Sequence, residues 1–141
     1  MSLSNHDILR YASDRNIPYF RGVYMLDTLP KSGVLGHECG IVNLDNSKGS
    51  GTHWVSYYKH DSTRIYFDSF GQVTPMEIQK YLKTKSEFRK NIAVIQRNTD
   101  IVQHINTSNC GYLCLYVLES LGKGQSFQHI INTLRQHYGY S

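Results

Sequence analysis

Apolar residues recur at helical spacing near the start of the chain. Ile8, Leu9 and Ala12 fall on one face of a predicted helix, with polar residues on the other. Ser4 precedes this stripe and Asp7 follows it three residues later, a spacing typical of a capping box at a helix N-terminus. The chain therefore begins with a short helix, which must end before the next proline.

Three further helices are predicted in the second half of the chain. Residues 110–121 are strongly apolar and are followed by a glycine, and residues 127–138 are amphipathic. The remaining helix follows the central strands, where Thr74 can act as N-cap, Pro75 can occupy the first helical position and Glu77 can complete a capping box.

The middle of the chain favours strands because β-branched and aromatic residues gather there. Two of these segments form a predicted hairpin around a two-residue turn at His60 and Asp61. The predicted strands comprise residues 20–26, 40–44, 52–59, 64–68 and 91–96. Helices at both ends and strands between them predict an α+β fold, with a largely antiparallel central sheet flanked by helices.

Composition narrows the class of protein. The chain has 141 residues, of which 40% are hydrophobic and 18% charged, so it can bury a core and we expect a single domain over residues 1–141. No apolar run is long enough to span a bilayer, and the N-terminus lacks the pattern of a secretory signal. We therefore expect a soluble protein that is neither secreted nor bound to membranes.

The formal net charge is +4, which favours contact with polyanions. A nucleic-acid-binding module without catalysis is therefore one hypothesis. A solvated helix face is the favoured explanation of a basic cluster here, because aromatic residues are not regularly interleaved with the lysines. The candidate residues for polyanion binding are Lys80, Lys83, Lys85, Arg89 and Lys90.

The three cysteines form neither an even-numbered disulfide framework nor a Cys-x-x-Cys pair. Their spacing therefore predicts no disulfide scaffold and no metal site, and it indicates a reducing compartment. Cys39 and Cys114 lie among apolar neighbours and are interpreted as core residues.

Cys110 is a candidate nucleophile because it opens the predicted helix 110–121. The positive end of the helix dipole stabilises a thiolate at that position. A buried core cysteine would satisfy the same pattern. Gly111 favours the nucleophile, since a glycine beside the thiol would let a substrate backbone approach.

The predicted hairpin provides a base and a carboxylate for that nucleophile. With a turn at His60 and Asp61, His53 lies directly opposite Asp68, and a register shift by two residues would keep both side chains on one face. The other six histidines are interpreted as lacking an equally placed carboxylate. Gln103, in the polar loop before Cys110, could donate its amide to a developing oxyanion.

These candidates occur in the order His, acid, Gln, Cys. The segments that carry them are Gly-Thr-His-Trp at 51–54, Tyr-Phe-Asp-Ser-Phe-Gly at 66–71, Val-Gln at 102–103 and Asn-Cys-Gly-Tyr-Leu-Cys at 109–114. Together with residues 17–24 and 39–43, and the seven-residue step from Gln103 to Cys110, they resemble the adenovirus-type (adenain-like) cysteine proteases, whose clan includes the SUMO-deconjugating proteases.

The resemblance implies a papain-like or adenain-like fold and a role for each matching residue. Cys110 would be the nucleophile, His53 the general base and acid, Asp68 the orienting carboxylate, and Gln103 part of the oxyanion hole. The same motifs imply an active-site wall or substrate-binding surface formed by Trp54, Gly51, Gly111 and Asn109.

The chain departs from the adenoviral pattern at two positions. Asp68 stands where the adenoviral enzyme has glutamate, as in the SUMO proteases, so pairing with His53 should survive. Ile92 stands where that enzyme has the cysteine that bonds an activating peptide, so no disulfide-tethered peptide is expected. The resemblance implies a compact, monomeric version from an adenovirus-like virus, a virophage or a polinton-type element, for which DNA or a peptide could still serve as activator, though no cofactor is required.

The leading functional hypothesis is a cysteine endopeptidase that cleaves viral capsid or core precursors after small residues, in Gly-Gly or Gly-X-Gly contexts. Such an enzyme would act inside the host cell, in the nucleus or a viral factory, and be packaged in the virion. The alternative enzyme hypothesis is a peptidase for ubiquitin-like modifiers, which also end in Gly-Gly.

Overall fold

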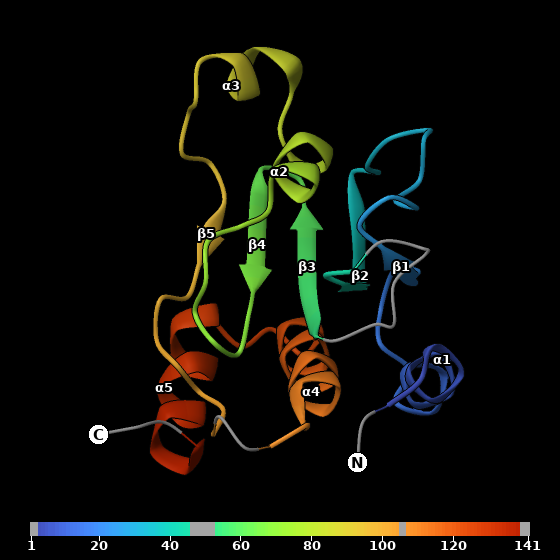
Figure 1. The fold of residues 1–141 in the computed structure, drawn as a ribbon, viewed down its shortest axis with the longest axis vertical. Coiled ribbons are helices and arrows are strands. Elements are labelled where there is room, and N and C mark those ends of the chain that lie inside the picture. The colour runs from blue at the N-terminus through green and yellow to red at the C-terminus, as the bar shows by residue number, and fades with distance from the viewer. Residues whose placement is uncertain (1–2, 46–52, 105–106, 139–141) are drawn as a thin grey trace.

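A computed structural model, which describes residues 3–45, 53–104 and 107–138, contains a five-stranded sheet in the order β1-β2-β3-β4-β5 (Figure 1). The strands are β1 (Phe20–Met25), β2 (His37–Asn43), β3 (Trp54–His60), β4 (Thr63–Phe67) and β5 (Gln96–Arg97). The helices are α1 (Asn5–Asp14), α2 (Met76–Leu82), α3 (Lys85–Arg89), α4 (Cys110–Gly122) and α5 (Phe127–Tyr138).

The sheet is antiparallel at its centre and parallel at its edges. β2 pairs with β3 and β3 with β4 in antiparallel fashion, whereas β1 joins β2 and β5 joins β4 in parallel. The α+β class and the flanking helices are confirmed. The parallel edges arise because the chain crosses over before it adds each outer pairing, which a local sequence pattern does not reveal.

The hairpin register differs from the predicted one. His60 pairs with Thr63, so the turn consists of Asp61 and Ser62, and Ser56 pairs with Phe67. The predicted turn at His60 and Asp61 was wrong by one residue, which shifts the pairing register of β3 and β4 by two residues. Because side chains alternate with a period of two along a strand, this displacement leaves every residue on its expected face.

The segment between β4 and α4 departs most from prediction. Of the expected strand at 91–96 only Gln96 lies in a strand, as the first residue of β5, because the backbone N–H of Ile92 donates instead to the carbonyl of Glu87 in α3. Thr74 does not cap α2, whose N-cap is Pro75. The unpredicted helix α3 is capped by a box between Thr84 and Glu87, a signal that the sequence does contain.

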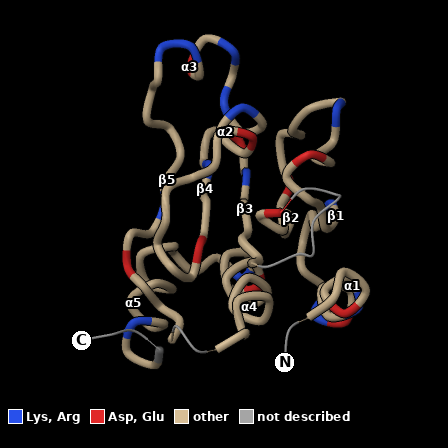
Figure 2. The backbone as a smooth tube through the Cα atoms, viewed as in Figure 1, with Lys and Arg blue, Asp and Glu red and all other residues tan. Residues whose placement is uncertain are grey.

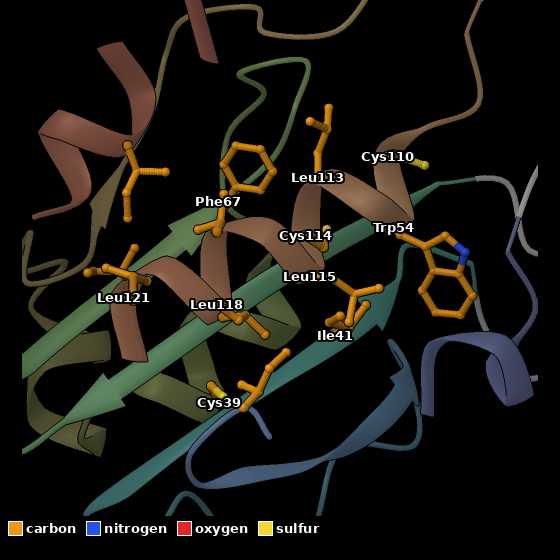
Figure 3. Close-up of a cluster of buried hydrophobic side chains, with 14 of the residues drawn as sticks. Cys39, Ile41, Trp54, Phe67, Cys110, Leu113, Cys114, Leu115, Leu118 and Leu121 are labelled. Carbon is orange, nitrogen blue, oxygen red and sulfur yellow. The ribbon is translucent and has the colours of Figure 1, made fainter. Parts of the chain in front are cut away.

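Two apolar clusters hold the sheet between helices. One is centred on α4, which packs against β3, α1 and α5. Figure 3 shows Cys114, Leu115 and Leu118 in this cluster, with Cys110 at the first turn of the helix. The other cluster joins β3 and β4 to Ile78 and Leu82 of α2. No helix within the described ranges is both long and apolar enough to cross a membrane.

A buried carboxylate fastens β2 to the second cluster. Glu38 is only 1% exposed and accepts hydrogen bonds from the hydroxyls of Tyr57 (2.5 Å) and Tyr81 (2.8 Å). Its other oxygen accepts from the backbone of Leu35 at 2.7 Å and from the Arg21 guanidinium at 2.9 Å. Strand β1, strand β3 and helix α2 thereby meet at one charge, which is stable only while all its partners are present.

Replacing Arg21 by Met should lower the free energy of unfolding by about 3 kcal/mol, because it leaves the Glu38 charge buried without its cation. Urea unfolding followed by circular dichroism measures this loss. The double variant Arg21→Met/Glu38→Gln should lose less than the sum of the two single variants, since the charge is gone. A loss below about 1 kcal/mol for Arg21→Met would mean that the pair behaves as a surface ion pair.

Candidate active site

A tight turn after β4 positions the first site residue, Asp68. One oxygen of this carboxylate accepts a bond from the backbone N–H of Phe70 at 2.9 Å, and the carbonyl of Asp68 accepts one from Gly71 at 2.8 Å. Gly71 adopts a φ of 67°, and a Cβ there would lie 2.4 Å from the carbonyl oxygen of Thr99. The glycine is therefore required for the turn that aims the carboxylate.

His53 lies next to this carboxylate, one residue before β3. Its Nε2 is 2.7 Å from Oδ1 of Asp68, which is 1% exposed. The ring of Phe70 stacks on the imidazole, with centroids 5.0 Å apart. The pair predicted from the hairpin therefore exists. In the observed register His53 and Asp68 are diagonal neighbours, just beyond the last paired residues of β3 and β4.

Cys110 is the first residue of α4 and is 7% exposed. All three cysteines of the chain are free thiols, and Cys39 and Cys114 lie in the core as predicted. Burial raises the pKa of Cys39 to about 12 and also raises that of Cys114. Only Cys110 has the surroundings of a reactive thiol.

The pKa values of Cys110 and His53 move in opposite directions. Burial acts to raise the pKa of Cys110, but the hydrogen bond and charge of His53, with the backbone of Trp54 and Gly111, lower it below its ordinary value. Burial acts to lower the pKa of His53, yet Asp68 and Cys110 raise it to about 9. These shifts favour a thiolate–imidazolium pair, which is an activated nucleophile.

The Gln103 side chain is 1% exposed and held at both ends. Its oxygen accepts a bond from the Ser69 hydroxyl at 2.5 Å, and its nitrogen donates to the carbonyl of Thr107 at 2.8 Å. Ser69 follows Asp68, and Thr107 precedes Cys110 by three residues, so the amide bridges the two halves of the site. An amide nitrogen has two hydrogens, and among the described residues only the carbonyl of Thr107 accepts from it.

The remaining predicted wall residues have varied surroundings. The indole nitrogen of Trp54 donates to the carbonyl of Leu3 at 3.0 Å. A Cβ on Gly111 would lie 3.2 Å from Leu3 and 3.4 Å from Trp54, so packing within the chain accounts for this glycine and substrate approach is not needed to explain it. Asn109 is the N-cap of α4, and its side chain accepts a bond from Thr107 at 2.9 Å. Gly51 lies outside the described residues.

The basic residues proposed for polyanion binding lie far from this site. Figure 2 shows lysines and arginines gathered around α2 and α3, at the end of the molecule opposite the start of α4. Lys80, Lys85, Arg89 and Lys90 are exposed, and Lys83 is partly buried.

One interpretation of the other histidines was wrong. His37 has a carboxylate partner, since its Nε2 is 3.0 Å from Oδ1 of Asp61. His60 lies beside it, with ring centroids 4.1 Å apart. The partners are 24 residues apart in sequence, and the pairing of β2 with β3, for which the sequence predicts no register, brings them together.

Sequence reasoning also missed Asn98, which holds the Asp68 turn. Its amide oxygen accepts the backbone N–H of Asp68 at 3.2 Å, and its nitrogen donates to the carbonyl of the same residue at 2.6 Å. Asn98 is 4% exposed and follows β5 directly. A polar residue immediately after a short strand is a weak signal, because only the parallel pairing of β5 with β4 brings it here.

This fold, with a thiol at a helix start beside an imidazole and a buried carboxylate, is that of a cysteine peptidase. Residues 39–138 match the model of the Ulp1 protease family, C-terminal catalytic domain. The chain therefore belongs to the Ulp1 protease family, and the predicted family resemblance is confirmed.

Solved structures agree on the fold. A crystal structure of a protease from African swine fever virus superposes with a TM-score of 0.61 at 16% identity, over 92% of this chain and 61% of that one. A selenomethionine form of the same viral protease gives 0.56 at 17% identity, over 99% of this chain and 68% of that one. The chain thus spans about three fifths of the length of the first of these. No curated protein sequence matches it.

The pH dependence of alkylation should reveal the pair. Iodoacetamide should label Cys110 at pH values below the ordinary thiol pKa of 9.0, because the lowered pKa keeps the thiolate present there. His53→Ala should shift this profile to higher pH, since it removes the hydrogen bond and charge of the imidazole. Mass spectrometry of the labelled peptides measures both profiles.

Cys39 and Cys114 serve as internal controls in the same digest, because their raised pKa values keep them protonated. Equal, slow labelling of all three thiols, or a Cys110 profile that His53→Ala leaves in place, would show that no activated pair exists.

Proposed function

We propose that the chain is a cysteine endopeptidase in which Cys110, His53 and Asp68 form the catalytic triad. The observation that supports it most strongly is the position of His53, which bonds Asp68 at 2.7 Å and raises the thiolate character of Cys110. A carboxylate that fixes the ring while the ring activates a thiol is the arrangement that acyl transfer requires.

The proposed reaction has two steps. The Cys110 thiolate attacks the carbonyl carbon of the scissile peptide bond, and the imidazolium of His53 gives its proton to the leaving amine as the C–N bond breaks. This leaves a thioester on Cys110 and a neutral imidazole. His53 then takes a proton from water, whose oxygen attacks the thioester as the C–S bond breaks. The product leaves as a carboxylic acid, which loses its proton to solvent, and the thiolate–imidazolium pair re-forms.

Gln103 is proposed to stabilise the negative oxygen of each tetrahedral intermediate. Its bonds to Ser69 and Thr107 fix the amide, and among the described residues nothing else accepts from its second N–H. The backbone N–H of Cys110 would be the other donor. Such fixed donors are effective because they need no reorganisation as charge develops.

We propose viral capsid or core precursors as substrates, cleaved after small residues in Gly-Gly or Gly-X-Gly contexts inside the host cell. Support comes from the family and from the wall beside Cys110, where Trp54 is fixed by its bond to Leu3 and packs over Gly111. A rigid indole favours a substrate segment without side chains. Neither a cofactor nor a second subunit enters this mechanism.

Cys110→Ala should abolish cleavage of a fluorogenic peptide ending in Gly-Gly, because it removes the nucleophile. Gln103→Ala should lower kcat roughly 100- to 1,000-fold, the usual effect of losing one oxyanion donor. Gln128→Ala, on the exposed face of α5, is the matched control and should leave kcat unchanged. Full activity of Cys110→Ala would eliminate the proposed nucleophile.

The same assay separates two substrate classes. A peptidase for ubiquitin-like modifiers is the alternative, favoured by the match to the Ulp1 protease family. Faster hydrolysis of a SUMO-type C-terminal amide than of the short Gly-Gly peptide would favour deconjugation. Equal rates would favour recognition of the cleavage motif alone.

The basic cluster favours a second function, binding of DNA at the α2–α3 end. A triple variant that replaces Lys85, Arg89 and Lys90 by Gln should weaken binding to duplex DNA and reduce the slope of log K against log salt by about 2 to 3. Fluorescence anisotropy at several salt concentrations measures this slope.

The control variant loses the same charge elsewhere, through Arg10, Lys31 and Lys123, which are exposed and outside the cluster. Similar slopes for the two triple variants would show that net charge, and not this cluster, determines DNA binding.

A further inference from the structure

Three potential metal ligands meet at the end of the sheet remote from Cys110. His37 begins β2 and His60 ends β3, and the two residues are direct partners in the antiparallel register. Asp61 follows in the turn. One ligand atom from each of the three side chains lies within 4.8 Å of the other two, the only such group among the described residues.

The backbone holds these residues in place. The sheet fixes the two histidines opposite each other, and their rings lie 4.1 Å apart between centroids. Asp61 has a φ of 53°, and its N–H bonds to the carbonyl of Gly36 at 2.9 Å, so the turn is tied to the residue preceding β2. The Tyr19 ring packs edge-on against His37 at 5.4 Å.

The donor set selects a class of metal ion. Two imidazole nitrogens and one carboxylate oxygen suit Zn²⁺ and neighbouring divalent ions, and suit Ca²⁺ and Mg²⁺ poorly because those prefer oxygen alone. Neighbouring ligands of a tetrahedral Zn²⁺ lie roughly 3.3 Å apart given bonds of about 2.0–2.1 Å. The 3.0 Å distance between His37 Nε2 and Asp61 Oδ1 already approaches this spacing.

We propose that His37, His60 and Asp61 bind a divalent transition-metal ion of the zinc class, with water completing its coordination. The ion would replace the contact between His37 and Asp61 and join β2, β3 and their turn. Lys59, whose Nζ donates to the carbonyl of Asp61 at 2.6 Å, places a positive charge nearby and weakens the site. Affinity is therefore expected to be moderate.

The proposed site is separate from the catalytic pair. His53 directly precedes β3 and His60 is its last residue. At the rise of an extended strand the two residues are about 20 Å apart. A bound ion would stabilise the sheet without touching Cys110. A thiolate beside an imidazole also binds Zn²⁺, so the test must remove that second site.

The test uses Cys110→Ala as the parent protein and ZnCl₂ as the probe. Isothermal titration should give one Zn²⁺ per chain, and the thermal melting temperature should rise with Zn²⁺ concentration. His37→Gln and Asp61→Asn, each in the parent, should weaken binding at least about tenfold and remove the thermal shift. His6→Gln, on the exposed surface of α1, should behave as the parent does.

Co²⁺ provides an independent signature, because the intensity of its visible absorption reports the number and geometry of its ligands. The Asp61→Asn variant keeps both histidines and lies on an exposed turn, so it tests the site even if His37→Gln unfolds. Zn²⁺ binding of equal strength in the parent, His37→Gln and Asp61→Asn would overturn the proposal, as would the absence of binding by the parent.

Discussion

The negative charge of Asp68 is the constraint around which the end of the molecule that holds His53 and Cys110 is built. A carboxylate with 1% exposure is stable only if hydrogen bonds and a cation replace its water. Phe70 supplies a backbone N–H and His53 supplies the imidazolium. The Asn98 side chain bonds both the backbone N–H and the backbone carbonyl of Asp68. These partners lie before β3, after β4 and after β5, so the charge can be satisfied only when these three strands are assembled.

That requirement links the reactivity of Cys110 to the fold. The thiol is activated through His53, whose raised pKa depends on Asp68, which in turn depends on the turn ending at Gly71. Gln103 extends the same chain of contacts through Ser69 to the loop before α4. By contrast, the buried charge of Glu38 only joins elements of the fold: through Arg21, Tyr57 and Tyr81 it connects β1, β3 and α2. The two buried carboxylates thus serve separate ends of the molecule.

The parts of the structure that local chemistry determines could be predicted from the sequence. The capping box of Ser4 and Asp7, the apolar helix α4 and the shared face of His53 and Asp68 all follow from spacings within one element or one hairpin. The short strand β5 and the role of Asn98 could not be predicted, because both depend on a parallel pairing with β4 across 30 residues of chain. The partnership of His37 with Asp61 was missed for a similar reason. It depends on the pairing of β2 with β3, which places His37 opposite His60 beside the turn that holds Asp61, and no local pattern specifies that pairing.

The position of Trp54 has a spectroscopic consequence. It is the single tryptophan of the chain, it is adjacent to His53, and its ring packs beside Gly111 at the start of α4. Intrinsic fluorescence excited at the indole therefore originates entirely from this position beside His53, without any engineered label. Binding of a peptide there, or a change in the charge of the neighbouring thiol and imidazole, would alter the emission directly, so the protein carries its own optical reporter of site occupancy.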